Sequence, residues 1–374
     1  MYPVAKGTDT GFRRFVSLPK KTGAQVSKEG MSFLKCTFAP PDFAANDVAG
    51  VPDDYRGPSL VKKHRYVGSL VNSVANTDTY IVLMPVPGVA YFKFTTVAGV
   101  APTASTVLTG VAYSDSNTIF GSSTATNDVV SRFRYISNHI ELIPTVNQMN
   151  WTGSISAWKI TAAFNNRPGS QAGAPTNASD IYTIGGLEGL VNSNVNQWSS
   201  PVNLGVYTAA YNSGNGFPFT PIATNFPNAT VPFQLDNADF GQINCAAVGS
   251  FTGFDNNFET VAIKISGQGA NVNNSFIVKT WACVEYQVVS GSLLYEYQTL
   301  SPHDPIALEL YRLIILQLPV GVSFIDNESF WKRVLSIMKS ISSVVSFIVI
   351  FLLCVLLVIV ICHHLNQVFL FYYK

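Results

Sequence analysis

The sequence predicts an all-β fold, and three observations lead to that prediction. Runs of residues with high strand propensity are separated by segments rich in Gly, Asn and Pro. Several runs alternate between apolar and polar positions: Val261, Ile263 and Ile265 face one way, and Lys264 faces the other. Helix and strand patterns do not alternate, and the chain has no internal repeat. A β-sandwich is therefore the expected core.

The predicted strands can be placed in chain order. They cover Tyr80–Met84, Val89–Thr96, His139–Ile143, Ile155–Thr161, Thr260–Ser266 and Ser275–Val288. Turn-rich connections such as Asn165–Gly169 and Tyr211–Gly216 separate them. The stretch from 165 to 259 exceeds ordinary loop lengths, so we expect it to hold an insertion that decorates the sandwich.

The segment before the sandwich, residues 1–35, is a moderately basic arm. Four of its cations, Arg13, Arg14, Lys20 and Lys21, could neutralise RNA phosphates without reading sequence. A solvated tail explains the same residues equally well. The net charge of +1 over the whole chain argues against a dedicated nucleic-acid-binding protein.

The main domain covers residues 36–326, and three shorter segments follow it. Residues 327–343 predict a basic amphipathic helix, whose candidate membrane-active residues are Phe330, Trp331, Val334 and Ile337. Residues 344–362 carry no charge and are long enough for one membrane-spanning helix, and 363–374 form a short tail. Three interpretations stay open for the apolar block: a lytic peptide, a tail anchor, or a product of frame drift.

Composition narrows the function classes. Hydrophobic residues make up 47% of the chain and charged residues 12%, which suggests that much surface is buried against other copies. Residues 1–30 contain no continuous apolar core, so we expect synthesis in the cytosol. None of the five histidines lies in a nucleophile elbow or zinc motif, and no phosphate-binding loop is present. Conventional enzymes are therefore disfavoured.

Two segments far apart in the sequence look like halves of one site. Asp42 follows two prolines that stiffen the backbone, with Phe38 and Phe43 available to shield it from water. A shielded carboxyl can stay protonated near neutral pH and act as an acid toward a peptide carbonyl. Asn327 lies where globular sequence gives way to the basic amphipathic stretch, so the peptide bond after Asn327 is the candidate target.

These segments, Phe33–Phe43 and Ile325–Val334, resemble the coat proteins of the insect nodaviruses. The resemblance covers about 300 residues, because collinear matches are spread along the chain. They include Gly88–Tyr91, Phe133–Tyr135, Gly153–Ile155, Trp158–Lys159, Gly186–Leu187, Trp281–Tyr286, Ala307–Leu308, Tyr311–Arg312 and Leu318–Val320.

The resemblance implies an eight-stranded viral jelly roll with an inserted, β-rich protruding region and a C-terminal helical membrane-active tail. It also implies an icosahedral shell of identical subunits, packaged RNA, and a location in the virion and the host cytoplasm. A single self-cleavage after Asn327, with Asp42 as the catalytic residue, would free a membrane-active peptide. Glu328 departs from the small residue usual after the cleavage point, and we expect its carboxylate to slow or prevent cleavage.

Two further sites are implied by the same resemblance. Asp128 and Glu188 match positions that bind calcium between subunits, and carboxylates suit this ion. Cys36 and Cys283 match a cysteine pair that could form a disulfide, with two buried thiols as the alternative. The alternative for the whole protein is a virus-derived, tail-anchored β-sandwich that serves as a binding or scaffold module.

Overall fold

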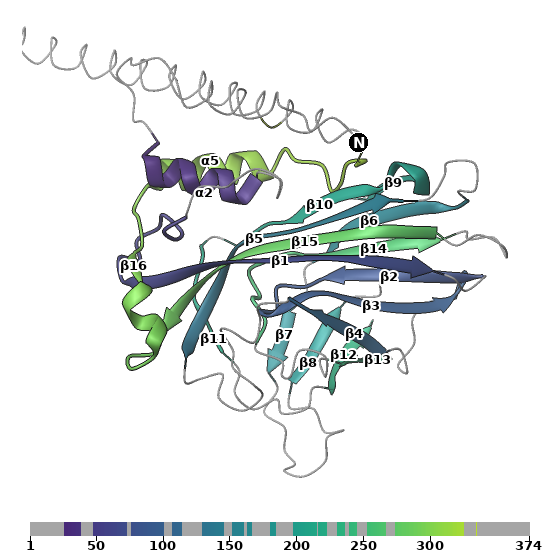
Figure 1. Cartoon of the computed structure of the whole chain (residues 1–374), viewed down its shortest axis with the longest axis horizontal. Coiled ribbons are helices and arrows are strands. Elements are labelled where there is room, and N and C mark those ends of the chain that lie inside the picture. The colour runs from purple at the N-terminus through teal and green to yellow at the C-terminus, as the bar shows by residue number, and fades with distance from the viewer. Residues whose placement is uncertain are drawn as a thin grey trace, which may run out of the picture.

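The computed structural model describes residues 26–38, 48–72, 76–100, 107–113, 129–145, 152–160, 163–166, 180–184, 197–214, 216–222, 230–235, 239–244, 253–266, 274–324 and 334. Two β-sheets pack against each other, and two helices, α2 (Lys28–Phe38) and α5 (Pro305–Ile315), lie together at one end over the first sheet (Figure 1). The all-β sandwich predicted from the sequence is confirmed.

The first sheet has six strands and runs in the order β10-β5-β15-β1-β16, with β11 also paired to β5. Its pairs are all antiparallel. The strand bounds are β1 (Pro58–Asn72), β5 (Val130–Pro144), β10 (Val206–Ala210), β11 (Thr220–Pro221), β15 (Asn274–Val288) and β16 (Thr299–Leu300).

The second sheet has ten strands in the order β7-β8-β12-β13-β4-β3-β2-β14-β6-β9. Its pairs are antiparallel except β12 with β8 and β13 with β4. The bounds are β2 (Thr77–Leu83), β3 (Val89–Val97), β4 (Val107–Ala112), β6 (Ser154–Ile160), β7 (Ala163–Asn166), β8 (Asp180–Ile184), β9 (Gln197–Pro201), β12 (Thr230–Leu235), β13 (Asp239–Asn244) and β14 (Thr260–Ser266). The short helices η3 (Val202–Leu204) and η5 (Leu293–Tyr297) complete the described elements.

The main core lies between the sheets. It combines alternate residues of strands from both, such as Ile81 and Ile263 from the second sheet with Ile140 and Val278 from the first, and each of these four side chains is fully buried. Burial of these branched apolar side chains is the principal force that holds the two sheets together.

Strand β5 is buried on both faces, and this explains its unusual composition. Phe133, Ile140 and Leu142 face the other sheet, whereas Arg134 and His139 belong to the face covered by the helices. The pairing with β15 shifts register between Cys283 and Val284. That β-bulge lets polar residues of β5 point toward the helices while the apolar alternation toward the core is kept.

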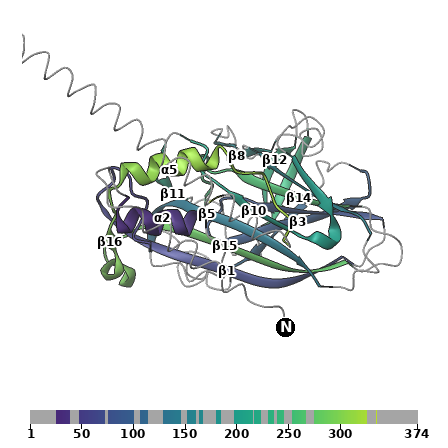
Figure 2. The same ribbon diagram turned by 90° about the horizontal axis from the view of Figure 1, so that it is seen from above.

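The helices are fastened to each other through one carboxylate. Asp304 caps α5 by accepting a hydrogen bond from the Ala307 amide (3.0 Å), and its other oxygen accepts from the amide of Ser27, next to α2 (2.6 Å). A Cβ on Gly30 would lie 2.2 Å from Oδ2 of Asp304, so the contact requires glycine at this position. Viewed from above, α2 and α5 cover β5 and β11 at the end near β16 (Figure 2).

All six predicted strands are present. The expected limits of the N-terminal arm and of the insertion, however, do not coincide with the elements of the structure. Helix α2 crosses the expected junction at residue 35 between arm and main domain, because its apolar residues pack on β5. The range 165–259 is not purely an insertion, since β9 pairs with β6 and β10 pairs with β5. The expected C-terminal helical tail lies outside the described residues, apart from Val334.

Candidate functional site

Most residues predicted for the site lie outside the part of the chain that the structure describes. These are Asp42, Asn327, Glu328, Asp128, Glu188, Arg13, Arg14, Lys20, Lys21, Phe330, Trp331 and Ile337. Cys36, Cys283 and Val334 are described. The site can therefore be built from the residues that hold the chain on either side of Asp42 and Asn327.

The Asp42 segment is anchored at both ends. Helix α2 ends at Phe38, whose fully buried ring lies 5.7 Å from the ring of Tyr211 and 5.8 Å from that of Tyr311. The described chain resumes at Val48, which is also buried, and the amide of Val51 donates a hydrogen bond to Glu285 (2.8 Å). Two well-packed anchors thus define where the nine residues between Phe38 and Val48 begin and end.

The segment leading to Asn327 is attached to strand β10. Tyr207 N donates to Val322 O (2.8 Å), Val322 N donates to Tyr207 O (2.9 Å), and the amide of Phe324 donates to Leu204 (2.9 Å). Thr208 adds a side-chain hydrogen bond to the Val320 carbonyl (2.6 Å). The chain is therefore fixed to the sheet as far as the third residue before Asn327.

The anchors of both segments belong to one apolar cluster, which we call the helix-face cluster. Its buried members are Met31, Phe33, Leu34, Cys36, Phe38, Val48, Val51, Ile136, Tyr207, Ala209, Tyr211, Phe217, Cys283, Ala307, Leu310, Tyr311, Ile314 and Val334. Phe38 and Val48 flank Asp42, whereas Val322 packs against the cluster and Val334 belongs to it, on either side of Asn327. The two halves of the predicted site thus emerge from the same apolar surface.

A hydrogen-bonded aromatic stack joins the two anchors. The ring of His139 lies parallel to that of Trp281, with centroids 4.9 Å apart, and its Nδ1 is 3.0 Å from the hydroxyl of Tyr207. Tyr207 in turn holds Val322 through its backbone. The backbone of Thr37, the residue before Phe38, also faces the His139 ring. A short chain of contacts therefore runs from the end of α2 to the segment before Asn327.

The environment of His139 keeps its imidazole neutral. Complete burial and, to a smaller extent, the positive charge of Lys159 lower the pKa of His139 to about 3, and the hydrogen bond with the Thr37 backbone partly opposes this shift. The Nε2 atom is buried and has no hydrogen-bond partner of good geometry within the described part of the molecule. The ring is thus a neutral positioning element that carries no charge at ordinary pH.

An ion pair lies beside the stack. Nζ of Lys159 is 3.1 Å from Glu259 and 4.2 Å from the centre of the Tyr211 ring, and Glu259 accepts a hydrogen bond from the Tyr211 amide (3.1 Å). Burial lowers the pKa of Lys159, and the charge of Glu259 opposes this shift. Because Tyr211 also packs against Phe38, this pair supports the anchor of the Asp42 segment.

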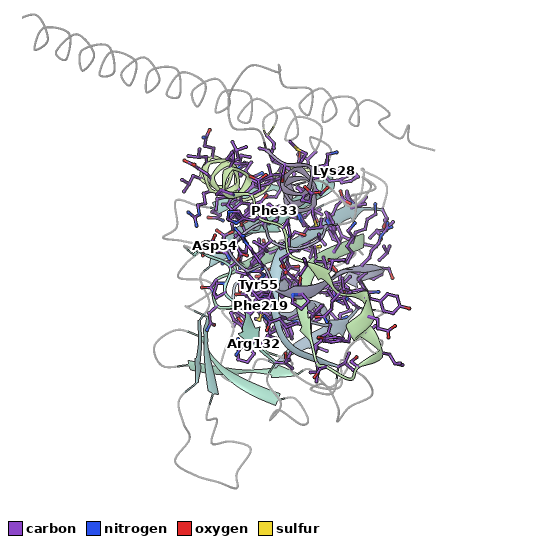
Figure 3. All side chains as sticks on the ribbon, turned by 90° about the vertical axis from the view of Figure 1, so that its left-hand side faces the viewer. Lys28, Phe33, Asp54, Tyr55, Arg132 and Phe219 are labelled. Atoms are coloured by element: carbon purple, nitrogen blue, oxygen red, sulfur yellow. The ribbon has the colours of Figure 1, made fainter. Side chains whose placement is uncertain are left out.

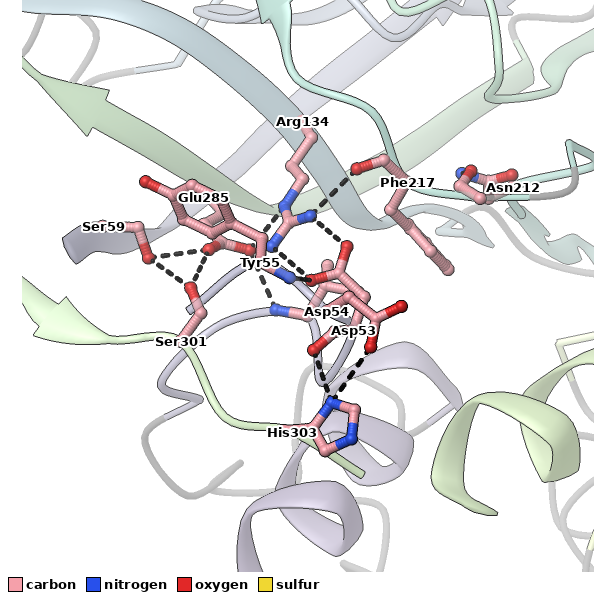
Figure 4. A network of polar contacts seen from close by, with 12 residues as sticks. Asp53, Asp54, Tyr55, Ser59, Arg134, Asn212, Phe217, Glu285, Ser301 and His303 are labelled. Atoms are coloured by element: carbon pink, nitrogen blue, oxygen red, sulfur yellow. Dashed lines mark hydrogen bonds and ion pairs between the residues drawn. The ribbon is translucent and has the colours of Figure 1, made fainter. Parts of the chain in front are cut away.

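A second buried network fixes the chain on the far side of Asp42 (Figure 4). The Arg134 guanidinium donates to Glu285 (Nε, 2.8 Å), to Asp53 (Nη1, 2.5 Å) and to the Phe217 carbonyl (2.9 Å). Arg134 is 1% exposed and Glu285 is fully buried. Ser59 and Ser301 donate to the remaining Glu285 oxygen, at 2.6 and 2.7 Å.

Aromatic rings close this network from outside. The guanidinium of Arg134 lies 4.2 Å from the centre of the Phe219 ring and 5.4 Å from that of Tyr55. Tyr55 and Phe219 meet edge to face with centroids 4.9 Å apart, and Figure 3 shows them side by side below Asp54. Residues 51–55 are thereby clamped to β5 and β15, which restricts the chain that follows the Asp42 segment.

The two predicted cysteines are neighbours and both thiols are free. Cys36 on α2 and Cys283 on β15 are buried, and Sγ of Cys36 also lies 3.8 Å from the Ser137 hydroxyl. The hydrogen bond between the thiols lowers the pKa of Cys36 and raises that of Cys283. The alternative of two buried free thiols therefore describes this structure, and the pair fastens α2 to the sheet.

Metal and membrane features are limited to what the structure describes. Within the described ranges, no group of three or more His, Cys, Asp or Glu side chains is arranged to hold a metal ion. Likewise, none of the helices described is long and apolar enough to cross a membrane. The calcium candidates and the apolar block 344–362 lie outside these ranges.

Sequence reasoning missed the roles of Arg134, His139 and Glu285. Arg134 and Glu285 lie in the motifs Phe133–Tyr135 and Trp281–Tyr286, and His139 begins a predicted strand. Charged residues inside strands that are otherwise strongly apolar are the signal that could have identified a buried network.

The chain is similar in sequence to proteins of a known family. The chain matches the model of the peptidase A6 family over residues 26–349. It is 34% identical over 322 residues to capsid protein alpha of Black beetle virus, covering 84% of this chain and 78% of that protein. For capsid protein alpha of Pariacoto virus the identity is 33% over 338 residues, with 87% and 83% covered.

Among solved structures, a chain of the T13 particle of infectious bursal disease virus gives a TM-score of 0.48 at 10% identity, covering 89% of this chain and 100% of that one. The relatives at 33–34% identity confirm the nodavirus resemblance seen in the sequence. The chain therefore belongs to the peptidase A6 family and is a structural capsid subunit of the nodavirus type, a component of the virion.

Proposed function

We propose that copies of this chain assemble an icosahedral shell and that each copy then cuts its own backbone once, between Asn327 and Glu328. One observation carries the proposal: the chain on both sides of Asp42 and on both sides of Asn327 is anchored in the helix-face cluster. Anchoring both segments on one rigid surface raises the effective concentration of the carboxyl group at the peptide bond.

The chemistry assigned to Asp42 is proton donation. An apolar surface disfavours the ionised carboxylate, so the protonated acid can donate to the Asn327 carbonyl oxygen and support departure of the Glu328 amine. The attacking group is either water, which leaves a carboxylic acid at Asn327, or the Asn327 side-chain amide nitrogen, which leaves a cyclic imide. In both routes one C–N bond breaks and the leaving nitrogen gains a proton.

The released segment begins at Glu328, and we assign it a membrane role through Phe330, Trp331, Val334 and Ile337. Val334 is fully buried in the helix-face cluster. An apolar side chain of the amphipathic stretch is thus covered in the uncut subunit, and cleavage would allow it to leave for a lipid surface.

Two further partners belong to the same proposal. Arg13, Arg14, Lys20 and Lys21 would neutralise the phosphates of packaged RNA, an interaction that weakens steeply with salt. Asp128 and Glu188 would hold calcium between neighbouring copies, because carboxylate oxygens are the ligands that this ion prefers. Both assignments rest on residue chemistry and on the relationship to nodavirus capsid proteins.

The test is a cleavage time course in purified particles, followed by gel electrophoresis. We expect the parent chain to lose a C-terminal fragment, Asp42→Asn particles to stay uncut, and Asp54→Asn to behave as the parent because Asp54 is fully exposed. Glu328→Ala should cleave faster than the parent, since it removes a negative charge beside the reacting carbonyl. Cleavage of Asp42→Asn at the parent rate would refute the assignment of Asp42.

A further inference from the structure

The segment between β15 and α5 exposes large apolar side chains. Leu293 is 92% exposed, Tyr297 and Leu300 are each 71% exposed, and Tyr295 is 46% exposed. These residues belong to η5 and β16, and we call Leu293–Leu300 the tip. Figures 1 and 2 both place β16 and the adjoining turn at the end of the sandwich where β1 begins. Such clustering of exposed apolar side chains is typical of an interaction surface.

The tip is a formed structure whose backbone is held by hydrogen bonds. Ser292 caps η5 by accepting a hydrogen bond from the Leu294 amide (3.2 Å), and the Tyr295 amide donates to the Ser292 carbonyl (2.9 Å). Leu294 packs against the main core, and β16 pairs with β1. A surface ordered before binding loses little conformational entropy when a partner covers it.

The size and charge of the tip indicate what covers it. Its four exposed large apolar side chains offer about 400 Å² of apolar area, roughly half of the 800 Å² that each partner buries in a standard protein interface. Glu296 is the only charged residue from Leu293 to Leu300. A lone carboxylate disfavours RNA phosphates and anionic lipid headgroups, whereas an apolar protein surface fits.

We propose that the tip is a contact between subunits, in which Leu293, Tyr297 and Leu300 pack against a second copy of this chain. This inference rests on the capsid function and names the surface that assembly uses. The edge position of β16 in its sheet supports it, since an edge strand presents backbone groups and side chains to a neighbour. The tip would form the apolar centre of a larger interface, surrounded by polar contacts.

The test compares assembly by a tip variant and by a matched control. The variant Leu293→Ser/Tyr297→Ser removes two strongly exposed apolar side chains of η5. It keeps Leu300, Leu294 and the Ser292 cap. Leu316→Ser is the control, because Leu316 is 81% exposed yet lies at the end of α5. Circular dichroism and thermal unfolding should be the same for parent, variant and control, since none of these side chains is buried.

The expected result is a fall of about tenfold or more in particle yield for the tip variant, measured by sedimentation, with the control at the parent level. Parent-like yield of the tip variant, or an equal loss in the control, would overturn the inference. Absence of particles from the parent chain itself would instead refute the shell assembly on which the inference depends, so the two failures are distinguishable.

Discussion

Replacement of Arg134 by methionine gives the sharpest test of how the sandwich holds the Asp42 segment. Methionine keeps the length and apolar packing of the arginine stem but removes its charge. The carboxylate of Glu285, fully buried, keeps its hydrogen bonds from Val51, Ser59 and Ser301 and loses its cation. Removal of one partner from a buried ion pair costs about 3–5 kcal/mol.

That magnitude can be measured directly. For a domain of this size, 1 kcal/mol shifts Tm by about 2–4 °C, so Arg134→Met should lower Tm by roughly 6–20 °C. Urea unfolding of dissociated subunits at neutral pH would give the free energy of unfolding. Arg132→Met is the matched control, because Arg132 lies two positions away on the same strand and is exposed; it should change stability by about 0.5 kcal/mol or less.

A double variant distinguishes lost charge balance from lost packing. Arg134→Met/Glu285→Gln removes both charges, so it should be more stable than Arg134→Met alone by about 1–3 kcal/mol. Two results would show that the network does not hold residues 51–55 in the way described. In one, the losses of stability in the two single variants add up to the loss in the double variant; in the other, Arg134→Met lowers the free energy of unfolding by less than about 1 kcal/mol.

The remaining predictions concern the anchors on the helix-face cluster. Tyr207→Phe removes the hydroxyl bonded to His139 but leaves the backbone pairing with Val322, so we expect slower cleavage in particles that assemble normally; an unchanged rate would exclude a positioning role. The pKa of His139 is about 3 in the folded chain and about 6.5 in the unfolded chain. Between these pH values the unfolded chain therefore binds a proton at His139 that the folded chain does not, so the free energy of unfolding decreases as the pH falls from 6.5 toward 3. His139→Gln should remove about 2 kcal/mol of the stability difference between pH 7 and pH 5; identical pH profiles for parent and variant would contradict this. Gly30→Ala normally stabilises a helix by about 1 kcal/mol, but here its Cβ meets Asp304, so chemical unfolding should instead report a net loss of stability.

Sequence patterns predicted six of the sixteen strands that the structure describes, and β1 is the longest of those that they missed. The six predicted strands are present, including Thr260–Ser266 with its expected bounds. Strand β1 was missed because Lys62, Lys63, His64 and Arg65 interrupt its apolar pattern, although pairing with β15 places it inside the sheet. Tertiary pairing outweighed local composition there.

The sequence suggests a chemistry for the candidate site, but it does not reveal the contacts that hold the chain on either side of it. The motifs that contain Asp42 and Asn327 could be found because an acid behind two prolines and a change in sequence character are local signals. The link through Thr37, His139 and Tyr207 depends on a β-bulge and on contacts between distant strands, which local sequence does not encode.

The most direct measurement of the central claim is the intact mass of the subunit in purified, aged particles. The account predicts two species whose masses place the break between Asn327 and Glu328, and Asp42→Asn particles with one full-length species. A shell fragment lighter by a water molecule than the free acid indicates attack by the Asn327 side chain, whereas a free acid follows either from attack by water or from later hydrolysis of the imide. Uncut protein retained in membranes, with no particles, would contradict the account and favour the tail-anchored scaffold.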